Sequence, residues 1–199
     1  MLTDNQRREA AEALFAAERD RAPIPLITTT YPGADVEDGY RISMAVTELK
    51  LAAGRTIKGH KIGLTSKAMR STTGATEPDY GTLFDDWFVD EASNVPRARM
   101  NMPLVEVELA FVLGAPLVGP SINAADVIRA TDFILPALEI VDFRYTARPT
   151  LVDSIADAAP VGSWCSAATR AVSPTSTFGA SAPASRRTAR SRRPALRRP

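Results

Sequence analysis

Residues Pro103 to Leu113 read P-L-V-E-V-E-L-A-F-V-L, and this stretch decides the fold. Nine of its eleven residues are apolar, which predicts a β-strand that is covered on both faces. The exceptions are Glu106 and Glu108, and the two-residue period of a strand puts both carboxylates on one face, roughly 6 to 7 Å apart. Like charges in an apolar element require a cation or hydrogen bonds, because burying an unpaired carboxylate costs several kcal/mol.

A second apolar segment carries one more carboxylate. Residues 133–142 read F-I-L-P-A-L-E-I-V-D, with Glu139 in the middle. Three glutamates on two apolar strands match the oxygen ligands of a hard divalent ion such as Mg²⁺, which keeps waters that a substrate can displace. A Zn²⁺ site is disfavoured, since the chain has one Cys and one His. The alternative is that Glu106 and Glu108 mark the solvent-facing side of a half-exposed strand.

Length and composition are ordinary for a globular protein. The 199 residues are enough for one sizeable core or two small ones, and 45% of them are hydrophobic. No stretch approaches the ~20 apolar residues of a membrane span, and the first residues lack an apolar signal core. The lone Cys165 cannot form an internal disulfide. We therefore expect a cytoplasmic protein that does not contact membranes.

The charges are unevenly distributed along the chain. Of the 24 basic residues, eight arginines follow Asp157, whereas none of the 23 acidic residues does. The first 157 residues therefore hold 16 basic residues against 23 acidic ones, a formal charge of −7. We predict an acidic globular body followed, over residues 158–199, by a basic low-complexity tail. The tail is expected to be disordered, because a Ser-, Ala-, Pro- and Arg-rich segment buries too little apolar surface.

Capping and turn signals divide the body in two. Thr3 begins a capping box that predicts a helix to about Arg19, and Asp35 or Asp38 can cap a second helix that ends at Gly54. Strands are then predicted over residues 56–64, 83–89, 103–113 and 133–142, with a short helix near residue 123. This alternation predicts an α+β fold, with a helical region over residues 1–55 and a β-rich domain over residues 56–157 that contains the predicted metal site.

The predicted strand over residues 56–64 reads T-I-K-G-H-K-I-G-L and contains His60 and Lys61. An amine in a confined apolar setting loses solvation, which lowers its pKa and suits it to acid–base or substrate-polarising work. The alternatives are a surface lysine with a packed stem and a structural role for His60. Asp79 lies in a P-D-Y-G segment, where turn formation is the ordinary role of an aspartate.

Four motifs follow one another along the body. They are G-H-K-I-G-L-T-S at residues 59–66, E-P-D-Y-G at 77–81, V-E-V-E-L-A-F-V-L at 105–113 and L-P-A-L-E-I-V-D at 135–142, preceded by Y-P-G and E-D-G-Y within residues 31–40. Together they resemble the 2-oxo-4-enoate hydratases of the fumarylacetoacetate hydrolase superfamily. The first two motifs are most similar to the branch that hydrates 2-oxohept-4-ene-1,7-dioate in homoprotocatechuate (4-hydroxyphenylacetate) catabolism. The resemblance implies N-terminal helices and an incomplete mixed β-sheet of the fumarylacetoacetate hydrolase type.

The resemblance also implies a site. Glu106, Glu108 and Glu139 would bind Mg²⁺ or Mn²⁺, and Lys61 and Asp79, with His60, would line the pocket for a small 2-oxo dicarboxylic acid. The metal would stabilise the enolate of the substrate, acid–base residues would relocate the double bond, and water would add at C4. Lys61 is the candidate for polarising the oxo or enolate oxygen, and Asp79 for proton transfer or for holding Lys61.

Other activities fit the same resemblance. They are a 2-oxo-3-enedioate decarboxylase of the 4-oxalocrotonate type, a 2-oxopent-4-enoate hydratase and, outside enzymes, an inactive subunit or binding module. Intact relatives of this kind are expected to be homo-oligomers.

Residues after Asp157 depart from the family pattern, which continues with an Asn-Ala-Ala segment and a long β-rich stretch. Here A-A-P-V-G-S-W-C-S-A-A-T-R follows, and then the biased tail. We interpret the chain as a truncated or frameshifted hydratase, whose site can be encoded without being competent. The alternative for the tail is a basic arm for nucleic acid or an acidic surface, but its arginines are not interleaved with aromatic residues.

Overall fold

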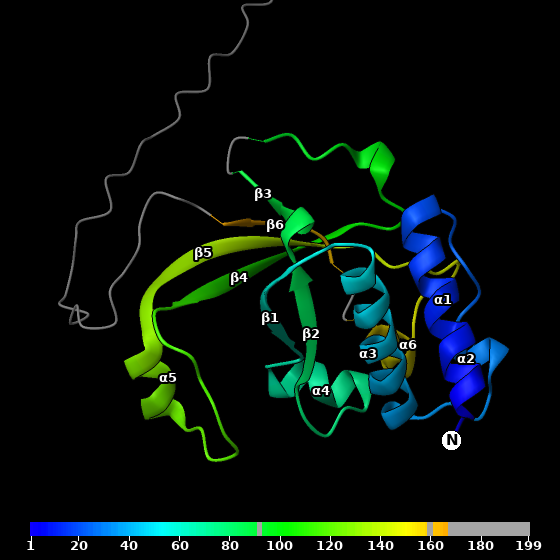
Figure 1. Ribbon diagram of the computed structural model, residues 1–199, viewed down its shortest axis with the longest axis horizontal. Helices are drawn as coiled ribbons and strands as arrows, with labels where there is room; N and C mark the ends of the chain where they lie inside the picture. The colour runs from blue at the N-terminus through cyan, green and yellow to red at the C-terminus, as the bar shows by residue number, and fades with distance from the viewer. Residues whose placement is uncertain (91–92, 159–160, 167–199) are drawn as a thin grey trace, which may run out of the picture.

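The computed structural model describes residues 1–90, 93–158 and 161–166, in which a layer of helices lies beside two small sheets (Figure 1). The helices are α1 (Asp4–Asp20), α2 (Ile27–Thr30), α3 (Val36–Ala52), α4 (Lys67–Thr73), α5 (Ala124–Ala130) and α6 (Leu151–Ala156), with 3₁₀ turns at Asp85–Trp87 and Arg97–Arg99. The strands are β1 (Ile57–Gly63), β2 (Asp79–Phe84), β3 (Phe88–Val89), β4 (Leu104–Leu113), β5 (Thr131–Val141) and β6 (Val161–Ser166). This mixture of helices and strands confirms the α+β prediction.

The helical layer forms around α3, which packs against both α1 and α6. Capping boxes begin α1 at Thr3 and α3 at Asp35, as the sequence predicts. Because α6 is formed by residues 151–156, this layer draws on a segment far from the first 55 residues. Its buried core consists of small and aliphatic side chains around one tyrosine: Leu2, Ala10, Ala11, Leu14, Ile27, Ile42, Val46, Tyr145 and Ala156.

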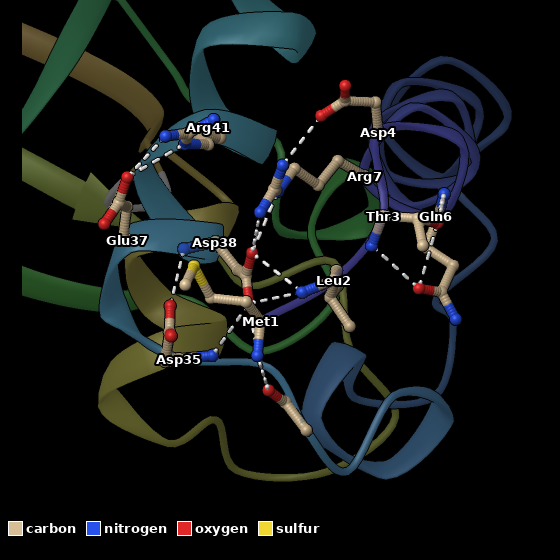
Figure 2. Close-up of polar contacts among 11 residues, drawn as sticks. Met1, Leu2, Thr3, Asp4, Gln6, Arg7, Asp35, Glu37, Asp38 and Arg41 are labelled. Carbon is tan, nitrogen blue, oxygen red and sulfur yellow. Dashed lines mark hydrogen bonds and ion pairs between the residues drawn. The ribbon is translucent and has the colours of Figure 1, made fainter.

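The starts of α1 and α3 are joined by the fully buried carboxylate of Asp38 (Figure 2). It accepts hydrogen bonds from the backbone N–H of Leu2 at 3.0 and 3.1 Å and from Arg7 Nε at 2.9 Å. The Asp35 N–H donates to it at 3.2 Å. Burial alone would raise the pKa of Asp38, but the Arg7 guanidinium and these N–H groups more than offset it, so the pKa lies below its ordinary value.

A cluster of buried and half-buried charges joins the helical layer to the sheets. Glu18 on α1 accepts from Lys50 at 2.6 Å, Arg55 at 2.7 Å and Arg144 at 2.9 Å. Lys50 Nζ also lies 4.4 Å from the ring centroid of Trp87, the last residue of the 3₁₀ turn that follows β2. Burial opposes ionisation of Glu18, but the surrounding cations hold its pKa well below the ordinary range. We call this group the Glu18 cluster.

The strands form two sheets. Strands β1 and β2 form an antiparallel hairpin, and the second sheet has the order β3-β6-β5-β4. In that sheet β3 runs parallel to β6 while the other neighbours are antiparallel, which makes it a mixed sheet. The hairpin lies on one side of the long β4–β5 ribbon (Figure 1). Leu83 and Phe84 of β2 pack there with Ala137 of β5, with Ala110 of β4 at the edge of the cluster.

The prediction that both faces of the β4 stretch are covered is wrong. Every residue of β4 is exposed or half-buried, and Val107 is 82% exposed. An apolar run indicates that a strand suits burial, but the second layer that would bury it must come from elsewhere in the fold.

The predicted strand over residues 83–89 also differs from the structure. Strand β2 begins earlier, at Asp79, and ends at Phe84, after which a 3₁₀ turn separates it from the short β3. Asp79 is therefore the first residue of a strand and pairs with Gly63 of β1. This non-local pairing overrides the turn-forming tendency of the P-D-Y-G segment.

No helix within the described ranges is long and apolar enough to cross a membrane. The backbone of Val161–Ser166 pairs with β5, at the start of the segment predicted to be a low-complexity tail. The prediction of disorder for the remainder of that tail, residues 167–199, lies outside the described residues.

Candidate functional site

The three predicted glutamates share one face of the sheet. Strands β4 and β5 pair so that Glu106 lies opposite Glu139, while Glu108 lies opposite Ala137. Paired residues and residues two apart point to the same side of a sheet. We call this side, with its three carboxylates, the acid face. The β1–β2 hairpin covers part of it, because Ala137 lies in a buried cluster with Leu83.

Lys61 forms an ion pair with Glu139 across the two sheets. Glu139 is 2% exposed, and its pKa is raised by burial, an effect that Glu106 and Glu108 reinforce and that the Lys61 ammonium opposes. Gly59 and Gly63 lie on the same side of β1 as Lys61 and present no side chain there. The Lys61 ammonium thus pairs with Glu139, the most deeply buried of the three carboxylates.

Asp79 lies beside this pair, at the start of β2. Its side chain is buried, and Oδ1 has no hydrogen-bond partner among the described residues. Burial raises the pKa of Asp79, although the Lys61 ammonium opposes the shift. A buried carboxyl with a raised pKa and an unpaired oxygen is suited to exchange a proton with a small molecule.

Gly63 was not among the predicted site residues, although it is one of the two glycines of the predicted strand over residues 56–64. A Cβ built at this position would lie 2.1 Å from Asp79 Oδ1, so the carboxyl occupies the space that a side chain would need. The sequence offers one signal for this role: Gly63 follows Lys61 by two positions, so the two residues share one face of the strand.

His60 is not brought to this group. It is adjacent to Lys61 in β1, so its side chain points to the opposite side of the strand, where it is exposed. The structure thus brings together Lys61, Asp79 and the acid face, and leaves His60 apart.

The donor set fits a hard divalent ion in its chemistry, because three carboxylates lie on one face with a single ammonium against them. Among the described residues, no three Asp, Glu, His or Cys side chains already converge as a metal-binding group. Lys61 holds the carboxylate of Glu139, and Glu106 is exposed. The assignment of the three glutamates as ligands stays a prediction.

Two cavities lie away from these residues. One, of about 390 Å³, is lined in part by Glu18, Trp87 and Arg144, next to the Glu18 cluster. The other, of about 210 Å³, lies between α3 and β2 and is lined in part by Tyr40 and Tyr80. Neither contains Lys61, Asp79 or a glutamate of the acid face, so charge and burial, and not cavity volume, define the candidate site.

Comparison with known proteins gives consistent similarities. The chain is 47% identical over 154 residues to the 2-oxo-hept-4-ene-1,7-dioate hydratase of Escherichia coli, an alignment that covers 74% of this chain and 58% of that protein. It is 35% identical over 156 residues to a 2-hydroxypent-2,4-dienoate hydratase of Pseudomonas putida, covering 77% of this chain and 70% of that protein. The chain thus spans less than two thirds of the E. coli hydratase. No protein-family model matches it.

Among solved structures, the chain is similar to the 4-oxalocrotonate decarboxylase of Pseudomonas putida G7 complexed with magnesium and adipate. The TM-score is 0.81 at 32% sequence identity, and the match covers 87% of this chain and 66% of that one. The fold described above is therefore the fold of that part of the decarboxylase.

Proposed function

Because the chain belongs to the family of the 2-oxo-4-enoate hydratases and 4-oxalocrotonate decarboxylases, in the fumarylacetoacetate hydrolase superfamily, we propose that it is a metal-dependent hydratase. Its proposed substrate is 2-oxohept-4-ene-1,7-dioate, an intermediate of aromatic catabolism, and its product 4-hydroxy-2-oxoheptanedioate. The observation that carries the proposal is the Lys61–Glu139 ion pair on the face that also holds Glu106 and Glu108. The 47% identity to the E. coli hydratase supports this choice of substrate.

In this proposal Asp79 and Lys61 have different roles in the two steps of the reaction. The C4–C5 double bond of the substrate must first move to C3–C4, which removes a proton from C3 and adds one at C5. Water then adds across C3–C4, with its hydroxyl at C4 and its proton at C3. Asp79, with its raised pKa and unpaired Oδ1, is the proposed proton carrier, and Lys61 the group that polarises the 2-oxo oxygen.

Glu106, Glu108 and Glu139 would hold Mg²⁺ or Mn²⁺. When bound, a divalent ion supplies Lewis acidity at the 2-oxo and carboxylate oxygens of the substrate. The magnesium of the decarboxylase structure supports a divalent ion in this family. Lys61 would then give up its contact with Glu139 and become available to the substrate.

The test is calorimetric titration of the purified protein with Mg²⁺, followed by titration with a 2-oxo dicarboxylic acid analogue. We expect saturable Mg²⁺ binding, loss of that binding in Glu106→Gln, and hydration of 2-oxohept-4-ene-1,7-dioate only when the metal is present. Glu48→Gln, which changes an exposed glutamate on α3, is the matched control. Saturable binding without turnover would instead favour a binding module, and no Mg²⁺ binding at all would refute the proposed site.

A decarboxylase is the second candidate, favoured by the likeness to 4-oxalocrotonate decarboxylase. The two activities differ in their products, because decarboxylation of a 2-oxo-3-enedioate releases CO₂ and hydration does not. Incubation with each substrate and Mg²⁺, with measurement of CO₂, separates them. Release of CO₂ without the 4-hydroxy product would assign the decarboxylase.

A further inference from the structure

An arginine on α4 is held in place by the backbone that follows β1. Arg70 Nη1 donates to the carbonyl oxygens of Leu64 and Thr65, both at 2.8 Å. Leu64 has a φ of 53° and turns the chain out of the strand. Arg70 is half-buried, and its Nε and Nη2 groups have no hydrogen-bond or ion-pair partner among the residues that the structure describes. The guanidinium therefore has a fixed position and one edge of N–H donors that is not used.

Arg70 lies at the same end of the hairpin as the candidate site. Helix α4 belongs to the segment that joins β1 to β2, next to the end where Gly63 pairs with Asp79 (Figure 1). Asp79 Oδ1 lies 2.1 Å from the position of a Cβ on Gly63, and Leu64 is the next residue. Standard bond lengths along this short path put Arg70 Nη1 no more than about 13 Å from Asp79 Oδ1.

This limit is compatible with the length of the proposed substrate. Its 2-oxo end would bind at the acid face and Lys61, while Asp79 would exchange protons at C3 and C5. With bonds of about 1.5 Å and contacts of about 3 Å at either end, a cation on the C7 carboxylate lies roughly 9 to 12 Å from such a proton carrier. The C7 carboxylate can therefore reach a cation in the position of Arg70.

The charge of the site requires such a cation. The acid face and the buried Asp79 surround the substrate with carboxylates, and a further carboxylate without a partner would bind at a cost of several kcal/mol. The other cation of α4, Lys67, is exposed. The free edge of Arg70, formed by Nε and Nη2, matches the two oxygens of a carboxylate in a way that an ammonium does not.

We propose that Arg70 binds the distal carboxylate of the substrate, and that it thereby selects 2-oxo dicarboxylic acids over 2-oxo monocarboxylic acids of the same length. The inference rests on the proposed function and names the residue that recognises the second carboxylate. Because the Nη1 contacts already hold the guanidinium, its binding to a carboxylate loses little conformational freedom.

The test compares two saturated seven-carbon acids that differ only in the second carboxylate, 2-oxoheptanedioate and 2-oxoheptanoate. Calorimetric titration of the full chain, with Mg²⁺ present, measures both dissociation constants. We expect Arg70→Gln to weaken binding of 2-oxoheptanedioate about 10- to 100-fold and that of 2-oxoheptanoate less than about twofold, because only the first acid loses a charge-assisted contact. Arg70→Lys, which keeps the charge without the fork, should restore part of the loss. Lys67→Gln, on the same helix, is the matched control.

A purely structural role for Arg70 predicts a different result. If its contacts only hold the turn after β1, Arg70→Gln should weaken binding of both acids equally, and that outcome would overturn the inference. Equal affinity of the wild type for the two acids, binding of neither acid, or an equal effect of Lys67→Gln would also overturn it. Circular dichroism verifies that each variant is folded. If Arg70→Gln does not fold, Arg70→Lys replaces it, and it must weaken binding of 2-oxoheptanedioate more than that of 2-oxoheptanoate.

Turnover distinguishes failure of this inference from failure of the proposed function. If the wild type hydrates 2-oxohept-4-ene-1,7-dioate and Arg70→Gln leaves KM unchanged, the function stands and the role of Arg70 is refuted. If the wild type selects 2-oxoheptanedioate through Arg70 but hydrates nothing, the role of Arg70 stands and the hydratase assignment is refuted.

Discussion

At the scale of single residues, Lys61 has two proposed roles: it pairs with a predicted metal ligand, and it polarises the substrate. Its ammonium pairs with Glu139, one of three carboxylates predicted to take a divalent ion, and it is also the candidate for polarising the substrate. A cation that competes with a metal for one carboxylate weakens the binding of that metal.

Lys61→Gln is therefore expected to have opposite effects on binding and on turnover. Removing the competing charge should raise Mg²⁺ affinity about tenfold, equivalent to ~1.4 kcal/mol. Turnover of 2-oxohept-4-ene-1,7-dioate should fall about 100-fold, because the polarising group is lost. Calorimetry and a product assay measure the two effects, with Lys58→Gln, an exposed lysine on the same strand, as the control. Weaker Mg²⁺ binding in Lys61→Gln would contradict this account of the ion pair.

Gly63 tests the position of Asp79. In Gly63→Ala the new Cβ would lie 2.1 Å from Asp79 Oδ1, so the carboxyl must move. We expect turnover to fall by about tenfold or more, with a loss of stability of no more than ~1–2 kcal/mol. Gly59→Ala is the control on the same face of β1, where a Cβ meets no atom within 4 Å. Equal activity of the two variants would show that the space beside Gly63 is not needed.

At the scale of elements, the capped helices were predictable and the strands only in part. Thr3 and Asp35 begin helices where the sequence places them, because a capping box is a local interaction between residues three apart. The start of β2 was missed, because Asp79 enters a strand by pairing with Gly63, sixteen positions earlier. The exposure of β4 was missed for a similar reason, because whether a strand is buried depends on a second layer of structure formed by other segments of the sequence.

The candidate site was predictable to a similar degree. The two-residue period of β4 places Glu106 and Glu108 together, but the ion pair of Lys61 with Glu139 joins residues 78 positions apart. Adjacent positions in the sequence suggested that His60 and Lys61 act together, whereas a strand separates neighbours onto opposite sides.

Asp38 provides a prediction about the two helix starts. The pKa of Asp38 in the folded protein lies below its ordinary value of about 3.9. The contribution of the ionised carboxylate to the free energy of unfolding is therefore fully present above pH ~4, and it is lost as the pH falls through the folded pKa. Asp38→Asn should cost about 2–3 kcal/mol at pH 7, because Arg7 loses its buried partner. The difference in the free energy of unfolding between wild type and Asp38→Asn should become smaller below pH 4.

Urea denaturation over this pH range measures the effect. Asp4→Asn, which changes a highly exposed carboxylate that also pairs with Arg7, is the control and should change stability by less than ~0.5 kcal/mol. A constant difference between wild type and Asp38→Asn at every pH would refute the role of this ionisation.

At the scale of the whole molecule, the Glu18 cluster holds the helical layer against the sheets. One carboxylate serves cations from α3, from the segment before β1 and from the segment after β5. Glu18→Gln should destabilise the protein by about 3–5 kcal/mol, because the buried ammonium of Lys50 loses the carboxylate with which it pairs. Denaturation measures the loss, and Glu12→Gln, an exposed glutamate of the same helix, is the control. A loss below ~1 kcal/mol would show that the remaining carboxylates are sufficient.

The two unlike faces of the β4–β5 ribbon also bear on how this gene can change. Deleting or inserting a single codon within β4 would turn its glutamates outward and its valines toward Lys61, because neighbouring strand positions face opposite ways. Such a change would remove both β4 glutamates from the candidate site in one step, whereas a point substitution removes only one of them. The loop between β4 and α5, which contains the exposed Val118, should accept the same insertions with little effect.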